Sequence, residues 1–174
     1  MSDPLKVVVV ALVVTAAFAL MWWGWRARAA RSAALVPELP PVPDVPALGP
    51  PRLGPLPVTY LATADATDRL SRVAVHRLAV RAPATVAVHD AGVLVQRVGA
   101  PDLFVPAADL LAVSRASGMA GTAVGADRVV VLRWALGAAT LDTGLLPRRA
   151  DDCAPLADAA SGLVAGADTD RSAG

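Results

Sequence analysis

The residues of this chain that could carry chemistry are few: two histidines, His76 and His89, and one cysteine, Cys153. A catalytic site needs a nucleophile, a base or paired carboxylates that converge on one place. A zinc site needs several Cys, His or carboxylate ligands at characteristic spacings, and neither histidine has such a set beside it. We expect His89, next to a turn, to lie at a solvated strand end. The sequence therefore predicts no metal site, no cofactor and no catalytic residue, so that the protein is not an enzyme.

The stretch GMAGTAVG, residues 118–125, is rich in glycine and raises the question of a phosphate cradle. Such a cradle joins a strand to a helix N-terminus and places a basic residue at its end. Here Ala126, Asp127 and another expected strand follow instead. The chain also has no G-x-S-x-G, Walker lysine or dinucleotide motif. We interpret the stretch as a hairpin loop, with a ligand-contact loop as the alternative.

The arginines are the remaining candidates for binding, because a polyanion is recognised by a positive surface. Ten Arg accompany eleven Asp between residues 58 and 168, so this part of the chain is close to neutral. That balance argues against nucleic acid as a partner, since nucleic-acid binding usually goes with a basic excess. One local cluster is a binding candidate for an unidentified ligand, with a solvated charged face as the alternative: Arg69, Arg72, Arg77 and Arg81.

The size of the chain limits what these residues can be part of. It has 174 residues, a formal net charge of +1 and a single cysteine. These values suit one small domain with accessory segments and exclude an internal disulfide.

The first accessory segment is an apolar run, residues 7–25, that contains no charge. As a helix it would reach about 28 Å, against a hydrocarbon core of about 30 Å. The apolar part of a signal peptide is shorter, at about 7 to 15 residues. We therefore predict that residues 1–34 form an uncleaved transmembrane anchor whose partner is the lipid bilayer.

The end of this run has the residues that hold a helix at a membrane surface. Tryptophan favours the headgroup layer, and arginine beyond it stays outside the membrane. The predicted interface anchors are Trp22, Trp23, Trp25, Arg26, Arg28 and Arg31. The positive-inside bias then places the protein in the cell (inner or plasma) membrane as a single-pass chain, with its C-terminal domain in the cytoplasm. One alternative is a cleaved signal followed by an exported β domain, which the small-x-small triplet at residues 27–29 favours. Another alternative is a buried helix of a soluble protein.

A proline-rich segment, residues 35–57, follows the anchor and holds nine of the fifteen prolines. Pro37, Pro40, Pro43 and Pro46 recur every third residue, which is the period of polyproline II. We expect a stiff linker that contains neither an α-helix nor a central strand. Its P-x-x-P pattern leaves open a docking ligand for an aromatic-lined groove.

Residues 58–165 alternate mostly with period two, which is typical of β-strands. Residues 85–89 and 93–98 predict a hairpin, with Gly92 in the left-handed position of a three-residue link. Residues 128–136 predict a strand that buries Val130, Leu132, Trp134 and Leu136 and turns Arg133 outward, with residues 140–145 as its partner. Residues 60–63, 102–105 and 111–115 are expected to be shorter strands. Residues 68–78 fit a helix or a strand.

The end of the domain changes to a helical period. Small or apolar residues recur from Cys153 at three- and four-residue steps through Leu156, Ala157, Ala160, Leu163 and Val164. Asp151 or Asp152 could cap the start. We expect this amphipathic helix to close the domain, and residues 166–174 to be a disordered tail.

Consecutive short strands followed by one helix indicate an α+β, mainly antiparallel partial barrel or sandwich closed by a C-terminal helix, the plan of pleckstrin-homology (PH) domains. Three stretches are also similar to actinobacterial single-span membrane proteins that carry a PH-like domain: TDRLSRVAVHRLAVR, VHDAGVLVQRVGAPDLFVPAADLLAV and VVLRWALGAATLDTGLLPRRADD. The resemblance implies a PH-like domain on a single membrane span but no particular activity, and we predict a membrane-anchored interaction or scaffolding module with an unidentified protein partner. A small-ligand or enzyme-like domain that uses the barrel mouth is the alternative.

Overall fold

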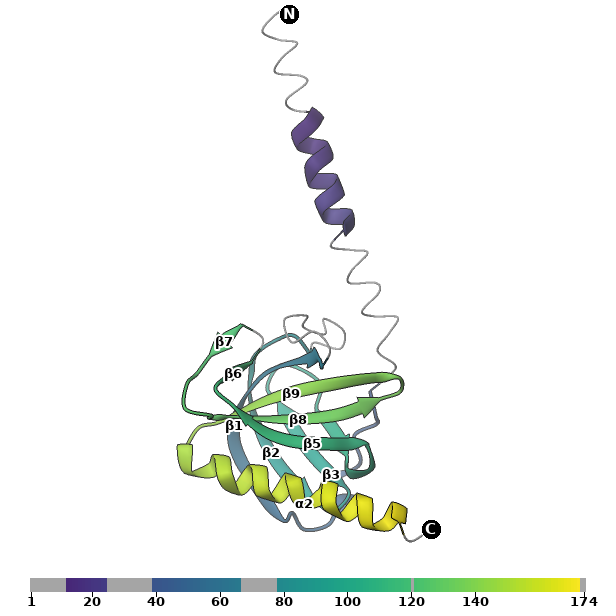
Figure 1. The fold of residues 1–174 in the computed structure, drawn as a ribbon, viewed down its shortest axis with the longest axis vertical. Helices are drawn as coiled ribbons and strands as arrows, with labels where there is room; N and C mark the ends of the chain where they lie inside the picture. The colour runs from purple at the N-terminus through teal and green to yellow at the C-terminus, as the bar shows by residue number, and fades with distance from the viewer. Residues whose placement is uncertain (1–11, 25–38, 67–77, 120, 173–174) are drawn as a thin grey trace, which may run out of the picture.

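The computed structural model describes residues 12–24, 39–66, 78–119 and 121–172 (Figure 1). Residues 12–24 form a helix. The larger part is a β-domain closed by one long helix, α2 (Cys153–Ser172). Among the residues described, short 3-10 helices are η1 (Val45–Leu48), η3 (Ala107–Asp109) and η4 (Ala150–Asp152).

The β-domain is one antiparallel sheet of seven strands in the order β4-β3-β2-β1-β9-β8-β5. A separate two-stranded hairpin, β6-β7, joins β5 to β8. The bounds are β1 (Leu53–Asp65), β2 (Ala82–His89), β3 (Gly92–Arg97), β4 (Leu103–Pro106), β5 (Leu110–Ala116), β6 (Gly118–Met119), β7 (Thr122–Ala123), β8 (Val129–Leu136) and β9 (Ala139–Pro147).

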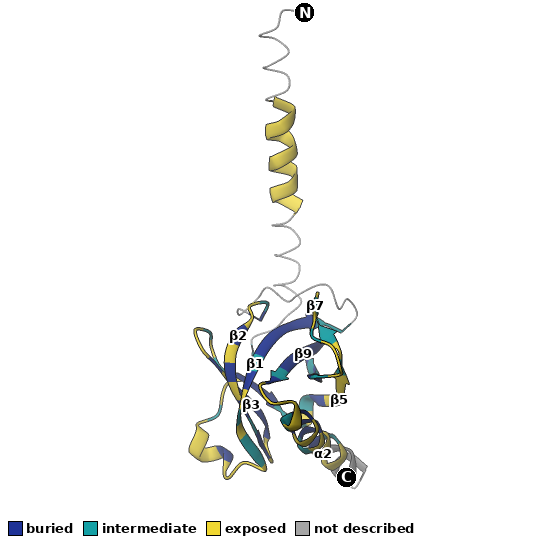
Figure 2. Ribbon diagram, turned by 90° about the vertical axis from the view of Figure 1, so that its left-hand side faces the viewer, coloured by how far each residue is buried: buried dark blue, intermediate teal, exposed yellow. Residues whose placement is uncertain are grey.

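The long strand β1 turns the sheet into a partial barrel. Residues 53–60 of β1 pair with β2, and residues 58–65 pair with β9. Register shifts fall in β1 between Leu53 and Leu56 and between Tyr60 and Ala62. Because such irregularities bend a strand, the two halves of the sheet face each other across an interior (Figures 1 and 2).

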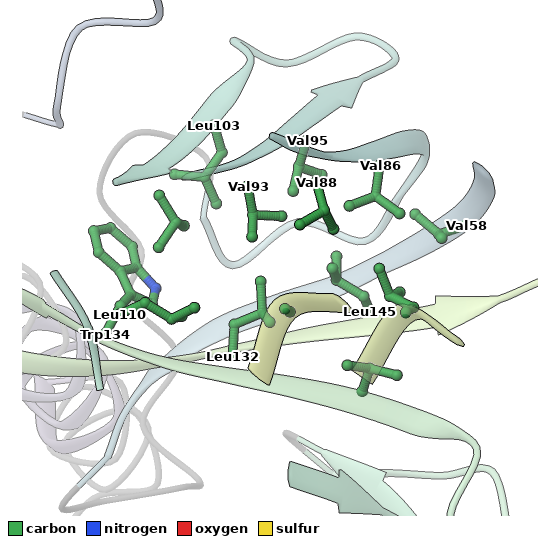
Figure 3. Close-up of a cluster of buried hydrophobic side chains, with 14 of the residues drawn as sticks. Val58, Val86, Val88, Val93, Val95, Leu103, Leu110, Leu132, Trp134 and Leu145 are labelled. Carbon is green, nitrogen blue, oxygen red and sulfur yellow. The ribbon is translucent and has the colours of Figure 1, made fainter. Parts of the chain in front are cut away.

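Side chains from both halves of the sheet and from α2 fill this interior. Val130, Leu132, Trp134 and Leu136 are all buried, while Arg133 lies on the other face, as the alternation predicts. Figure 3 shows valines of β2 and β3 directed toward leucines of β8 and β9, with the Trp134 indole beside Leu110. The centre of the barrel is therefore a packed core.

Helix α2 covers the side of the barrel between its two edges. It packs mainly against β5, and also against η3, η4 and β8 (Figure 1). The residues that it buries are the ones that the helical period predicts: Cys153, Leu156, Ala157, Ala160 and Leu163. The prediction of a mainly antiparallel β-domain with a C-terminal helix is confirmed.

A chain of hydrogen bonds crosses the core. The Tyr60 hydroxyl lies 2.7 Å from Thr63 Oγ1 and donates to the Leu78 carbonyl at 2.8 Å. Thr63 Oγ1 lies 2.8 Å from Thr143 Oγ1, which accepts from Trp134 Nε1 at 2.9 Å. These bonds satisfy polar atoms that burial would otherwise penalise, and they join β1, β8 and β9.

The strand predictions hold for β2, β3, β4, β5, β8 and β9, but the domain begins earlier than expected. β1 starts at Leu53, Pro57 pairs with Thr85, and Leu48 is buried against Leu94 and Phe104. The expectation that residues 35–57 hold no central strand and form only a linker is therefore wrong for its second half. Residues 68–77 of the segment for which a helix or a strand was expected lie outside the described residues.

Pro57 is tolerated in a central strand because of where its backbone points. Its carbonyl oxygen accepts a hydrogen bond from the Arg148 N–H at 3.1 Å, just beyond the end of β9 at Pro147. In an antiparallel strand the N–H and C=O positions of one residue point to the same side. The missing N–H of Pro57 thus faces the end of β9, where the ladder needs no donor.

Two further expectations are corrected. α2 continues to Ser172, so the helix does not end at residue 165 and most of the predicted tail is helical. Extending a helix costs little once its first turns are held by the core. The β2-β3 link is the two residues Asp90 and Ala91, and Gly92 is the first residue of β3, with φ +151.

Candidate functional site

The helix at residues 12–24 has an unusual surface. Every described side chain is exposed, including Phe18 (63%), Leu20 (65%), Trp22 (63%) and Trp23 (72%) (Figure 2). Large exposed apolar surfaces mark places where a protein meets another protein or a membrane. This helix is therefore the first candidate interaction surface.

The described part of this helix covers only some of the predicted anchor. Residues 7–11 and 25 of the expected span lie outside the described residues, as do four of the six interface anchors: Trp25, Arg26, Arg28 and Arg31. Within the described ranges, no helix has both the length and the apolar character needed to cross a membrane.

The arginine cluster that the sequence singled out is only partly placed. Arg69, Arg72 and Arg77 lie outside the described residues. Arg81 is exposed, directly before β2. This patch therefore remains a prediction.

The histidine prediction needs a correction. His89 is buried, with 3% of its surface exposed, and its Nδ1 lies 3.1 Å from the Gly49 carbonyl oxygen. It is covered because the proline-rich segment folds back over the end of β2, which the local sequence does not reveal. His76 lies outside the described residues.

The single cysteine lies at the start of α2. Cys153 is buried, and its thiol donates to the Arg128 carbonyl oxygen at 3.4 Å. Among the described residues, no three His, Cys, Asp or Glu side chains are grouped in a way that could hold a metal ion.

Arg97, which the sequence did not single out, is buried inside the barrel. Its guanidinium carbon lies 4.8 Å from the centre of the Tyr60 ring, and its Nε donates to the Pro101 carbonyl at 2.8 Å. Burial raises the pKa of Tyr60 to about 12, although the hydrogen bond with Thr63 and the charge of Arg97 act in the opposite direction. This arrangement stabilises the core and leaves the phenol neutral at ordinary pH.

A cavity of about 710 Å³ lies on the outer face of the sheet, beside β5 and the β6-β7 hairpin. The stretch GMAGTAVG does form a hairpin, and residues 118–123 of it line this cavity except for the undescribed Ala120. Val131 of β8 and Asp142 of β9 line it from the sheet. The hairpin interpretation is confirmed, and the hairpin also forms a wall of a hollow.

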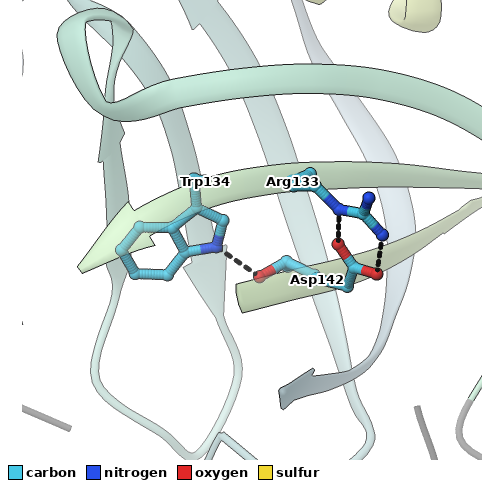
Figure 4. A network of polar contacts seen from close by, with 4 residues as sticks. Arg133, Trp134 and Asp142 are labelled. Carbon is cyan, nitrogen blue, oxygen red and sulfur yellow. Dashed lines mark hydrogen bonds and ion pairs between the residues drawn. The ribbon is translucent and has the colours of Figure 1, made fainter. Parts of the chain in front are cut away.

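Asp142, which lines this cavity, forms an ion pair with Arg133 (Figure 4). Arg133 Nε donates to Asp142 Oδ1 and Arg133 Nη2 to Asp142 Oδ2, both at 2.8 Å. The side chain of Asp142 is 3% exposed and that of Arg133 is 38% exposed. Hydrogen bonding and the charge of the carboxylate raise the pKa of Arg133 above its ordinary value.

This pair was not predicted from the sequence, although the β8-β9 hairpin contains a signal for it. Leu136 pairs with Ala139 across the Gly137 turn, and the same register places Arg133 opposite Asp142. Opposite charges directly across a strand pair attract each other. A register argument from the turn would therefore have found the contact, but not the cavity beside it.

The fold has the plan of a PH domain, with strand β1 shared by both halves of the sheet and one helix closing the barrel. A comparison with protein families agrees. A family described as "Bacterial PH domain-like" matches residues 36–161. The chain belongs to this family. The matched part of the chain begins within the proline-rich segment, in line with the early start of the folded domain, and ends within α2. No curated protein matches the chain.

Proposed function

We propose that this protein is a single-span membrane protein whose PH-like domain acts as a non-catalytic interaction or scaffolding module on the cytoplasmic side of the cell membrane. The observation that carries the proposal is the uncharged run of residues 7–25, whose described part is a helix with every side chain exposed. Apolar side chains that stay exposed in water are costly, at about 25 cal/mol per Å². A lipid environment removes this cost.

The order of residues after this run supports the orientation. Three tryptophans and then three arginines follow within residues 22–31, against one lysine and the amino terminus before it. Arginine and lysine near the end of a span favour the cytoplasmic side. The narrower similarity to single-span proteins of actinobacteria supports the same arrangement.

The interior of the domain favours interaction over chemistry at the barrel mouth. The inner faces of the strands are covered by packed aliphatic side chains and Trp134 (Figure 3). Inside the barrel the hydroxyl groups of Tyr60, Thr63 and Thr143 are bonded to one another. Outer surfaces are then the parts of the domain left to meet a partner.

A pair of fusions at the C-terminus tests the orientation. One carries a reporter that is active only in the cytoplasm, and the other a reporter that is active only after export. We expect activity from the cytoplasmic reporter alone and a membrane-bound chain of full mass. Activity of the exported reporter, or a mature chain that begins near Ala30, would overturn the proposal in favour of an exported β domain.

Cross-linking in intact membranes tests the interaction role. We expect a defined set of proteins to be captured through the PH-like domain, and the same set to be lost when the anchor is kept but residues 53–172 are deleted. Capture that is unchanged by this deletion would contradict a role for the domain.

A further inference from the structure

The outer face of the sheet beside the β6-β7 hairpin has two small residues, one on each side of a valine. Ser114 of β5, Val131 of β8 and Gly144 of β9 lie directly opposite one another in neighbouring strands. Strands usually carry β-branched or aromatic residues, which at the positions of Ser114 and Gly144 would fill this surface. The Met119 side chain of the hairpin instead lies over Gly144, with its Cγ 3.5 Å from the place of a Cβ on that residue. The hollow beside it measures about 710 Å³, within the range of small-molecule sites.

The floor of this hollow is apolar. Val131 belongs to a buried cluster with Leu61 and Val129, against which Ala116 and Met119 pack. A cluster of this kind on the outer face of a barrel excludes water from its surroundings. The apolar body of a ligand would find contacts there.

The ion pair beside the floor supplies the polar part of the site. Asp142 occupies Nε and Nη2 of Arg133, and so fixes the plane of the guanidinium. Arginine carries five N–H donors in a rigid fork, so a further edge remains when one edge is bound in this way. Asp142 is buried but the Arg133 side chain is 38% exposed, and an ion pair that is partly open to solvent contributes little net stability. We infer that the role of the ion pair here is to hold the Arg133 guanidinium in place so that it can bind a ligand group.

We propose that this hollow binds a small, mainly apolar carboxylate, with its carboxyl group on Arg133 and its apolar body against Val131 and Met119. The charges of the site favour one negative charge rather than two. Arg115 lines the hollow, and Arg133 is paired with the lining residue Asp142, so two arginines accompany the single carboxylate of Asp142. One monoanion brings these three charges to neutrality, whereas a phosphate dianion would leave one net negative charge beside the apolar floor, where an uncompensated charge is costly. The site does not depend on how the chain is anchored.

Calorimetric titration of the full chain in discs of neutral lipid tests the ligand class. The ligands are hexanoate, hexanol, acetate and hexyl phosphate, and each titration is corrected with empty discs. We expect saturable binding of hexanoate at one site, and binding of the other three at least about tenfold weaker, which is about 1.4 kcal/mol. Hexanol binding as tight as hexanoate binding would overturn the role of Arg133. Acetate binding as tight would overturn the role of the apolar floor, and hexyl phosphate binding as tight would overturn the preference for a single negative charge. Absence of saturable hexanoate binding would overturn the site itself.

Variants test the position of the site. Ser114 is exposed and lines the hollow, so Ser114→Phe should fill it and abolish hexanoate binding without disturbing the core. Thr85→Phe is the matched control, because Thr85 is an exposed strand residue of β2 away from the hollow. Arg133→Lys keeps the charge beside Asp142 but removes the fork, and should weaken binding by at least about tenfold. Unchanged affinity in Ser114→Phe, or equal loss in Thr85→Phe, would contradict the proposal.

Discussion

At the scale of single residues, Tyr60 shows how burial of one polar group makes stability depend on pH. It is the only tyrosine of the chain, it is fully buried, and its hydroxyl donates to the Leu78 carbonyl. Burial disfavours the charged phenolate, so the pKa of Tyr60 rises from 10.0 to about 12. The unfolded chain therefore loses this proton at a lower pH than the folded chain does.

We predict that the folded domain loses stability between pH 10 and pH 12, because ionisation of Tyr60 is favoured in the unfolded state over that range. The stability is fully present below pH 10, and the loss approaches about 2 to 3 kcal/mol as the pH passes the folded pKa. Urea unfolding of the full chain followed by circular dichroism measures it. Tyr60→Phe is the control and should flatten this part of the profile. A profile of the same slope in Tyr60→Phe would assign the loss to other groups.

Which residue positions can be predicted from the sequence depends on how local their causes are. The alternation in β8 predicts burial of Leu132 and Trp134 and exposure of Arg133, because it depends on neighbouring residues only. The burial of His89 depends on Gly49, forty residues away, and that of Arg97 on Tyr60. No local pattern contains such contacts. His89 was therefore expected in water, and Arg97 was not singled out.

At the scale of elements, Gly92 shows why a correct hairpin prediction can rest on an incomplete reason. The turn was expected to need Gly92 for its backbone angle. In the structure Gly92 lies between His89 of β2 and Pro106 of β4 and has φ +151. A Cβ there would meet the carbonyl oxygen of Val105 and would lie 2.9 Å from the Phe104 ring. The residue therefore permits the close approach of β4 as well as the turn.

We predict that Gly92→Ala destabilises the domain more than Gly99→Ala does. Gly99 also has a positive φ, +77, but a Cβ there meets nothing within 4 Å. The control should therefore cost only the backbone term, about 1 to 2 kcal/mol. Gly92→Ala adds displacement of β4, which we expect to cost at least about 1 to 3 kcal/mol more. Urea unfolding measures both, and equal losses would show that β4 gives way freely.

The strands that can be predicted from the sequence are those with strong local signals. Strands β2, β3, β8 and β9 carry strong alternation and short turns, so their existence and pairing are encoded locally. The first residues of β1 carry prolines, which argue against a strand wherever the donor is needed. Only the three-dimensional position of Pro57 at the end of β9 removes that objection. The start of the domain could therefore not be predicted from local propensity.

At the scale of the whole molecule, the two candidate sites differ in how they arise. The predicted anchor is a continuous run of residues, so its prediction needs only the length and charge of that run. The hollow exists because a hairpin after β5 lies over the outer face of β8 and β9, strands that come later in the chain. The glycine-rich stretch indicated the hairpin, but its position over Val131 and Asp142 follows only from the assembled sheet.

The anchor prediction can be tested with charge placed in two different parts of the chain. Arginine within a span costs roughly 2.5 to 3.5 kcal/mol each at the centre of the bilayer. The triple variant Val10→Arg, Val14→Arg and Leu20→Arg should therefore move the protein out of the carbonate-resistant membrane fraction. The control adds the same charge at exposed strand and turn positions of the domain, with the substitutions Thr85→Arg, Gln96→Arg and Val98→Arg. Because these side chains already face water, the control should stay in the membrane fraction. Retention of the first variant there would mean that residues 7–25 are not what holds the protein in the membrane.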